Sequence, residues 1–316
     1  MAFTMHSHSG QFCPGHAVDQ LEDIVQHAIE KGFKTMGLSE HMPRYEERDL
    51  YPEELSDPQG TLSSLPALHE AYLHEAQRLQ QKYAPKIHIL VGFEAEFIRP
   101  SYAPLVKTLA SSPAVDYFIG SVHHVHSIPI DYDQAKYAEA IAASGGSEER
   151  LYEDYYDLQH EMLLALKPKI VGHFDLIRLL SCDPGRDVRS WKGVWDRIIR
   201  NLRLVREQNG WLELNTAALR KGLEEPYPGR VIAEEWLKLD GRFTMSDDSH
   251  GIAHLATNYS RGLAYLTSLG VKALWTFERQ PEFHPGNDSP SKASLLEKPV
   301  LLESFEEHFP LQVPTT

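Results

Sequence analysis

FTMHSHSG (residues 3–10) begins a pattern that sets the fold: a short apolar run turns polar at its end and carries histidines there. Comparable runs follow at TMGLSEH (35–41), IHILVGFEAEF (87–97), YFIGSVHHV (117–125), KIVGHFDLI (169–177), WLELNTAAL (211–219) and RFTMSDDSH (242–250). Short apolar runs of this kind are typical of strands that are buried on both faces. The sequence therefore predicts seven buried strands with polar residues at their C-terminal ends.

Segments with helical spacing separate these runs, at about 18–31, 62–83, 101–111, 148–166, 188–208, 229–239 and 260–269. Strands that alternate with helices are parallel and joined by right-handed crossovers. We expect an α/β barrel, which brings the C-terminal ends of all its strands to one rim. An open doubly wound sheet is the alternative, but no G-x-G-x-x-G or Walker-type loop supports it. The run VKALWTF (271–277) is either an eighth strand or a closing edge.

The strand and helix alternation is unbroken from residue 3 to about residue 270, which favours one domain over residues 1–316. Its core is expected at about 3–277, followed by a polar C-terminal segment at 279–316.

Polar insertions at 44–61 and 125–150 are expected to form loops over the rim, where long loops are often functional. The tract at 279–298 is expected to be a surface excursion.

Composition narrows the class of protein. The net charge of −14 weighs against a nucleic-acid polymer as the main partner. No apolar stretch approaches ~20 residues, so no membrane-spanning helix is expected. The two cysteines, Cys13 and Cys182, give no disulfide framework and favour a reducing compartment. Together with an N-terminus that lacks a basic and a long apolar region, these features predict a cytoplasmic protein.

Metal-ligating residue types stand at almost every predicted strand end. His6 and His8 lie two residues apart in an extended chain, so both rings reach the same side. The other candidates are His16, Glu40, His41, Glu94, Glu96, His123, His173, Asp248 and His250. Any one of them alone is more often a structural histidine or a solvated carboxylate. Together they predict a site for two or three divalent ions, and nitrogen and oxygen ligands suit zinc, manganese or iron.

The ordered motifs H-x-H, E-H, G-x-E-A, G-S-V-H, G-H and D-x-H resemble those of the polymerase and histidinol phosphatase (PHP) superfamily, over residues 5 to 250. HSHSGQFCPGHA and IGSVHHVHSIPIDYD are most similar to the monofunctional histidinol-phosphatases. The resemblance implies a distorted seven-stranded (β/α) TIM-like barrel with a trinuclear metal centre at the C-terminal ends of its strands. The implied ligands are His6, His8, Glu94 and Asp248 for one ion, Glu94, His123 and His173 for a second, and His16, His41 and His250 for a third.

The same resemblance implies the hydrolysis of a phosphomonoester, L-histidinol phosphate, to L-histidinol and inorganic phosphate in histidine biosynthesis. Arg178 and Arg220 would bind the phosphate, since a guanidinium group holds such oxygens bidentately. Without this context, a single arginine near a strand end is as often part of a salt bridge. Water activated by the metal would attack phosphorus. Asp248 or a histidine of the rim would protonate the leaving alkoxide.

Three further acids, Glu40, Glu96 and Asp175, have two equally supported interpretations. They either bind the cationic amine and imidazole of the substrate or orient metal-bound histidines.

Competing functions remain at this point. Another small phosphomonoester or a nucleotide could be the substrate, and nucleases of the same superfamily are a further alternative. Amidohydrolases also begin with H-x-H on a barrel, but no lysine stands at a strand end here. A barrel that only binds metal as a scaffold is the non-enzymatic alternative.

Overall fold

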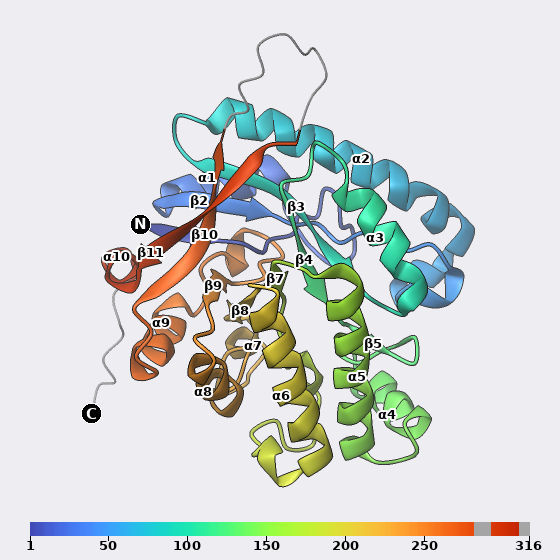
Figure 1. The fold of residues 1–316 in the computed structure, drawn as a ribbon. Helices are drawn as coiled ribbons and strands as arrows, with labels where there is room; N and C mark the ends of the chain where they lie inside the picture. Colours follow the sequence, from blue (N-terminus) through green and yellow to red (C-terminus); the bar gives the residue numbers. More distant parts are fainter. Residues whose placement is uncertain (281–291, 310–316) are drawn as a thin grey trace.

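Seven parallel strands form the centre of the molecule (Figure 1). In the computed structural model, which describes residues 1–280 and 292–309, their order is β1 (Ala2–Thr4), β2 (Phe33–Leu38), β3 (His88–Glu96), β4 (Tyr117–Ser121), β7 (Ile170–Val171), β8 (Trp211–Asn215) and β9 (Phe243–Ser246). The first and last strands meet, because the Met5 amide donates to the Met245 carbonyl at 3.0 Å and Ser7 bridges Ser249. The predicted seven-stranded barrel is confirmed, and the open sheet is excluded.

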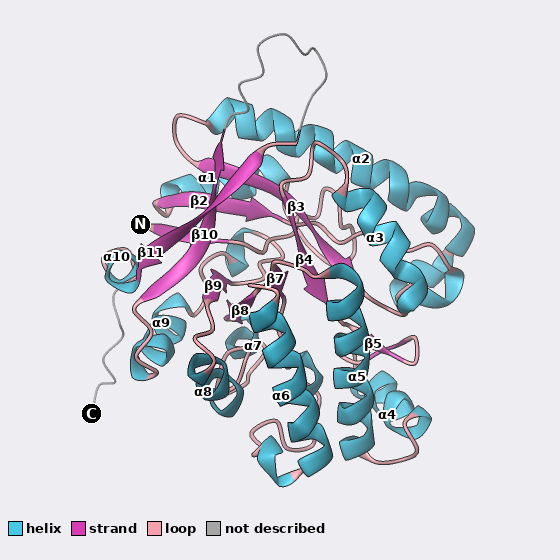
Figure 2. Cartoon of the chain, viewed as in Figure 1, coloured by secondary structure: helices cyan, strands magenta, loops and turns pink. Residues whose placement is uncertain are grey.

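Helices surround the strands on the outside, as Figure 2 shows. Seven of them occupy the predicted segments: α1 (Leu21–Glu30), α2 (Pro58–Tyr83), α3 (Ala103–Ala110), α5 (Glu148–Leu166), α6 (Lys192–Glu207), α8 (Arg230–Lys238) and α9 (Tyr259–Ser268). In α1 the buried residues are Leu21, Ile24, Val25 and Ala28, which recur at the spacing of one helix face. The apolar face of each such helix packs on the barrel and leaves the polar face in solvent.

Two glycines inside the barrel make room for a large side chain. A Cβ atom on Gly37 would lie 2.2 Å from the Tyr117 hydroxyl, and one on Gly92 would lie 2.5 Å from the Tyr117 ring. The Tyr117 hydroxyl donates to the Met5 carbonyl at 2.7 Å. Tyr117 thus fills the interior and connects β4 to the end of β1, which fixes where the following histidines begin.

The two predicted rim loops contain regular structure that the sequence did not reveal. Residues 44–61 include the 3₁₀ turns Glu47–Asp49 and Pro52–Ser56. Residues 125–150 include part of a hairpin, β5 (His124–Val125) and β6 (Ile128–Pro129), and the helix α4 (Gln134–Ala143). The side chain of Asp133 caps α4 by accepting from the Lys136 amide at 2.7 Å. The expectation of plain loops was wrong here, because a capped helix and a two-residue turn need only short sequence signals.

The run at 271–277 is neither an eighth barrel strand nor an edge of the barrel. It lies in β10 (Ala273–Gln280), which pairs antiparallel with β11 (Ser294–Leu301) and is followed by α10 (Leu302–Glu306). Phe277 of this ribbon stacks on Trp211 at a centroid distance of 4.7 Å. Trp211 begins β8, so the ribbon covers the N-terminal end of the barrel, opposite the predicted site; in Figure 1 it crosses the strands in orange and red.

The segment 279–298 was expected to be a surface excursion. Its two ends are instead strand residues, which belong to β10 and β11. Its middle, 281–291, lies outside the described residues. No helix in the described part of the chain has the length and apolar character required to cross a membrane.

Candidate metal centre

The predicted ligands converge at the C-terminal ends of the barrel strands. His6 and His8 follow β1, His41 follows β2, and Glu94 lies near the end of β3. The remaining ligands follow β4, β7 and β9; they are His123, His173, Asp248 and His250. Because the strands are parallel, all these side chains reach one rim, and most of them line a single cavity of about 180 Å³.

Glu94 lies at the centre of two ligand groups. Its Oε2 is 3.3 Å from His6 Nε2 and 3.6 Å from His8 Nε2, and Asp248 Oδ1 lies 3.7 and 3.4 Å from the same two nitrogens. Its Oε1 is 2.9 Å from His173 Nε2 and 3.4 Å from His123 Nε2. Each oxygen of this one carboxylate therefore faces a different group, as a bridging ligand requires.

A third group combines His8, His41 and His250. The rings of His8 and His41 stack at a centroid distance of 4.2 Å, and His250 lies 4.5 Å from His8. His16, which the resemblance assigns to the third ion, lines the same cavity but belongs to none of the three groups. Its Nε2 contacts Glu53 Oε1 at 3.2 Å, and its ring centroid lies 6.1 Å from that of His41.

The spacing and the unpaired nitrogens of these groups fit metal ions. Two ligands at zinc–nitrogen distances of about 2.0–2.1 Å lie roughly 3.3 Å apart at a tetrahedral angle. Their separations in the first two groups, 2.9 to 3.7 Å, bracket this value. The buried His6 Nε2, both ring nitrogens of His8, and His41 Nδ1 have no hydrogen-bond partner among the residues that the structure describes. Buried polar atoms are rarely left unpaired, so these atoms are placed to bind ions.

Glu213, which was not selected from the sequence, orients two of the predicted ligands, His6 and His173. Its Oε1 accepts from His6 Nδ1 at 2.7 Å, and its Oε2 accepts from the His173 amide at 2.9 Å. Burial opposes the Glu213 carboxylate, but the charge and hydrogen bond of His6 outweigh it and lower the Glu213 pKa. A carboxylate on Nδ1 fixes the tautomer that presents Nε2 to a metal. The only sequence signal was an acid inside the apolar run WLELN.

The three acids for which the sequence left two interpretations open, Glu40, Glu96 and Asp175, all accept hydrogen bonds from other residues of the protein. Glu40 Oε1 accepts from the Ser9 amide at 2.8 Å, and Glu96 Oε1 accepts from Arg44 Nη1 at 3.0 Å. Burial opposes the Glu96 carboxylate, yet Arg44 and His41 outweigh it and lower the Glu96 pKa. Asp175 Oδ2 accepts from Arg178 Nε at 2.8 Å. In this geometry they position neighbouring groups, and none of the three lines the metal-lined cavity.

Of the two aspartates in SDDSH, Asp248 joins the histidines. Asp247 instead accepts from the Ala256 amide at 2.5 Å, and burial raises its pKa to about 6. The backbone of Asp248 lies in the left-handed region, with φ of 48°. Arg220 supports this turn by donating to the carbonyls of both aspartates, at 2.7 and 2.8 Å. Arg220 therefore holds a strained strand end from which a ligand projects.

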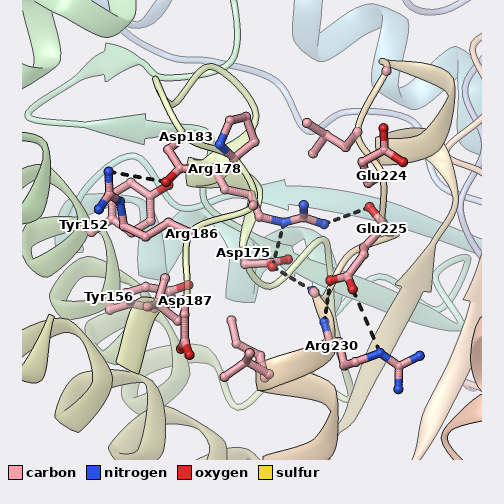
Figure 3. A pocket seen from close by; sticks show the side chains of 18 residues that line it. Tyr152, Tyr156, Asp175, Arg178, Asp183, Arg186, Asp187, Glu224, Glu225 and Arg230 are labelled. Carbon is pink, nitrogen blue, oxygen red and sulfur yellow. Dashed lines mark hydrogen bonds and ion pairs between the residues drawn. The ribbon is translucent and has the colours of Figure 1, made fainter. Parts of the chain in front are cut away.

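Arg178 lies at a neighbouring cavity of about 510 Å³ rather than at the one lined by metal ligands (Figure 3). Its Nε donates to Asp175, and its Nη2 donates to the carbonyls of Glu225 and Pro226. Its guanidinium lies over the Tyr227 ring, 5.1 Å from the ring centroid. The ring of Tyr227 in turn lies 6.3 Å from that of His173. The structure therefore does not bring Arg178 together with the predicted ligands.

The cavity wall includes four polar residues that sequence reasoning did not assign. Tyr51, Asp131 and Tyr132 come from the two predicted insertions, and Lys221 follows the short helix α7 (Ala217–Arg220). The insertions do reach the mouth of the site, as predicted. Their contributing residues could not be chosen from the sequence, because the path of an insertion over a rim depends on its tertiary contacts.

Comparisons with known proteins agree with this geometry. The PHP domain family matches residues 4–217 of the chain. A protein of Schizosaccharomyces pombe named probable histidinol-phosphatase is 40% identical over 89% of this chain and 91% of its own length. The histidinol-phosphatase of Saccharomyces cerevisiae is 32% identical over 84% of this chain and 88% of its own length.

Solved structures show the same fold. A presumed histidinol phosphatase of Listeria monocytogenes superposes with a TM-score of 0.69 at 25% identity, over 82% of this chain and 99% of that one. A histidinol phosphate phosphatase of Lactococcus lactis, in complex with zinc, L-histidinol and phosphate, gives 0.64 at 18% identity, over 87% and 96% of the two chains. With the matched family and the two yeast relatives, these findings show that the chain belongs to the PHP domain family, in its histidinol-phosphatase branch.

Proposed function

We propose that this chain is a metal-dependent phosphomonoesterase that hydrolyses L-histidinol phosphate to L-histidinol and inorganic phosphate. The observation that carries the proposal is Glu94, whose two oxygens face two separate ligand groups inside one cavity. A pair of ion sites that share a carboxylate is an arrangement suited to phosphoryl transfer. The histidinol-phosphatase names of relatives at 40% and 32% identity supply the substrate.

We propose three divalent ions, of zinc, manganese or iron. The first two would be held by the groups that share Glu94, and the third by His41 and His250 with either His8 or His16. Such ions supply a nucleophilic water at neutral pH and offset the charge on phosphoryl oxygens. The zinc in the L. lactis structure supports zinc as the first metal to test.

The groups that hold the phosphate come from the β8–β9 side of the rim. Lys221 lines the cavity, and Arg220 beside it keeps its Nε free of protein hydrogen bonds in the described part of the chain. Arg178 would have to leave its contacts with Asp175 to reach phosphate. The phosphate-binding roles of Arg178 and Arg220 stay predictions, as does protonation of the leaving alkoxide by Asp248.

Phosphate release from a panel of phosphomonoesters tests the proposal. The panel contains histidinol phosphate, p-nitrophenyl phosphate, glycerol phosphate and a nucleoside monophosphate, each assayed after chelation and after addition of zinc or manganese. We expect the highest kcat/KM for histidinol phosphate, and only with metal. A higher kcat/KM for the nucleotide would overturn the substrate. Failure to hydrolyse any member of the panel, with or without added metal, would favour the scaffold alternative.

Three further expectations remain predictions: a single domain over residues 1–316, a cytoplasmic location, and the absence of a nucleic-acid partner.

A further inference from the structure

We propose that Asp131, flanked by Tyr51 and Tyr132, binds the positively charged, imidazole-bearing end of the substrate. This inference rests on the proposed function, because it assigns the part of the cavity that would recognise histidinol phosphate among phosphomonoesters. Histidinol phosphate joins a phosphate to an amine and an imidazole. A site that selects it needs a negative group and an aromatic surface at some distance from the metal ligands.

The hairpin β5–β6 places Asp131 next to a predicted metal ligand. The chain leaves β4 at His123, turns through residues 124–129, and returns so that the Ile130 amide donates to the His123 carbonyl at 2.9 Å. Ile130 is fully buried. Asp131 is therefore held one residue beyond a backbone contact to His123, and its side chain lines the cavity.

Asp131 is the acid at this cavity that has neither a protein partner nor a place in a ligand group. Two other acids line the cavity, Glu94 and Asp248, and both belong to those groups. Within the described residues, no ion pair or side-chain hydrogen bond involves Asp131, and its Oδ1 is shielded from solvent without a partner. A shielded carboxylate oxygen is costly to leave unpaired, so it is suited to accept from a cationic ligand.

The flanking tyrosines supply an aromatic wall. The ring of Tyr51 lies 6.2 Å from that of Tyr132, and Arg44 packs over Tyr51 at 5.0 Å. Tyr51 is buried and fixed, whereas Tyr132 is 40% exposed. Imidazolium and ammonium groups bind favourably against such ring faces. A tyrosine that is 40% exposed has space for a ligand to cover it.

The opposite charge at this cavity comes from Lys221. The cavity therefore has groups for both ends of the substrate: Lys221 and the proposed ions for the phosphate, and Asp131 for the cation. A monoester without a cationic group would use only the first set.

The test is Asp131→Asn, which keeps the shape of the side chain and removes its charge. The substitution breaks no described contact, so the protein should fold. Charge-assisted hydrogen bonds are worth enough that we expect kcat/KM for histidinol phosphate to fall about ten- to a hundredfold. For p-nitrophenyl phosphate, which has no cationic group, kcat/KM should stay within about twofold.

Asp133→Asn is the matched control. It removes the same charge two residues away from an exposed position, and asparagine still caps α4. It should leave both substrates unaffected. An equal loss for both substrates in Asp131→Asn, or no loss for either, would overturn the inference. Failure of the proposed function is distinguishable, because the unmodified protein would then show no preference for histidinol phosphate.

Discussion

Replacing Glu213 by glutamine should weaken metal binding while the metal-free protein stays folded. The carboxylate accepts four hydrogen bonds. Oε1 takes those of His6 Nδ1 and the Ser246 hydroxyl, at 2.7 and 2.6 Å; Oε2 takes those of the His173 amide and Asn215 Nδ2, at 2.9 and 3.0 Å. A glutamine side chain has one oxygen and one NH₂ group. One of the two pairs of donors, either His6 with Ser246 or His173 with Asn215, would therefore face the NH₂ group.

The two orientations of the glutamine have different consequences. If its amide faced His173 and Asn215, two buried donors would be unpaired, at a combined cost of about 2–6 kcal/mol. If it faced His6, the Ser246 hydroxyl could rotate to accept, and His6 could accept at Nδ1 by moving its proton to Nε2. The second orientation costs less. In that orientation His6 carries its proton on Nε2, the nitrogen that faces Glu94 and Asp248, so a metal ion must displace this proton to bind.

Loss of such an orienting carboxylate lowers metal affinity by about ten- to a hundredfold. Competition against a chromophoric chelator would measure the affinity, and urea unfolding of the metal-free protein would measure its stability. Glu207→Gln, at an exposed position on α6, is the control and should change neither. A metal affinity within about twofold of the unmodified protein for Glu213→Gln would refute the assigned role of Glu213.

Three other substitutions test the fold and the rim. Burial lowers the pKa of His69 to about 4 in the folded protein. Between pH 6.5 and 4 the unfolded state therefore binds more protons than the folded state, and the free energy of unfolding falls as the pH falls. At pH 5 the loss from His69 is about 2 kcal/mol. Urea unfolding at pH 7 and 5 should show a loss of stability that is about 2 kcal/mol smaller in His69→Met than in the unmodified protein, and an equal loss in the two proteins would contradict this role of His69. Gly92→Ala should lower the free energy of unfolding by about 1–3 kcal/mol, because its methyl group would overlap Tyr117; an unchanged urea midpoint would contradict that packing. Arg220→Ala should reduce both metal content and kcat/KM, since the turn at Asp248 loses its two donors, and Arg220→Lys should not restore them. Unchanged metal content and kcat/KM in Arg220→Ala would argue against this support.

The barrel could be predicted because its signals are local and repeated. Each strand is a short apolar run with a polar end, as at residues 87–97 and 169–177, and each helix between them has its own apolar spacing. The ligand positions follow from the same pattern, since parallel strands carry their C-terminal residues to one rim. His6, Glu94 and His173 therefore meet as predicted.

The rest depends on contacts between segments that are distant in sequence. Glu213 becomes an orienting group only because β8 lies beside β7 and places it under His6 and His173. Arg178 fits a phosphate-binding motif in sequence, but the carbonyls of Glu225 and Pro226 attract its guanidinium to another cavity. His16 likewise reaches the cavity and contacts Glu53, from the following insertion.

The ribbon β10–β11 could not be predicted from the sequence either. Its apolar run at 271–277 looks like a barrel strand, and only its pairing with β11 and the contact of Phe277 with Trp211 assign it to the opposite end. A local pattern identifies a strand but does not select its partner.

The central claim is that ligand groups sharing Glu94 hold the ions on which hydrolysis of histidinol phosphate depends. The most direct measurement removes all metal by chelation, adds zinc in known equivalents, and follows phosphate release from histidinol phosphate at each step. We predict no release from the metal-free protein and a rise that levels off at about three equivalents of zinc per chain. Full activity in the protein freed of metal would contradict the claim.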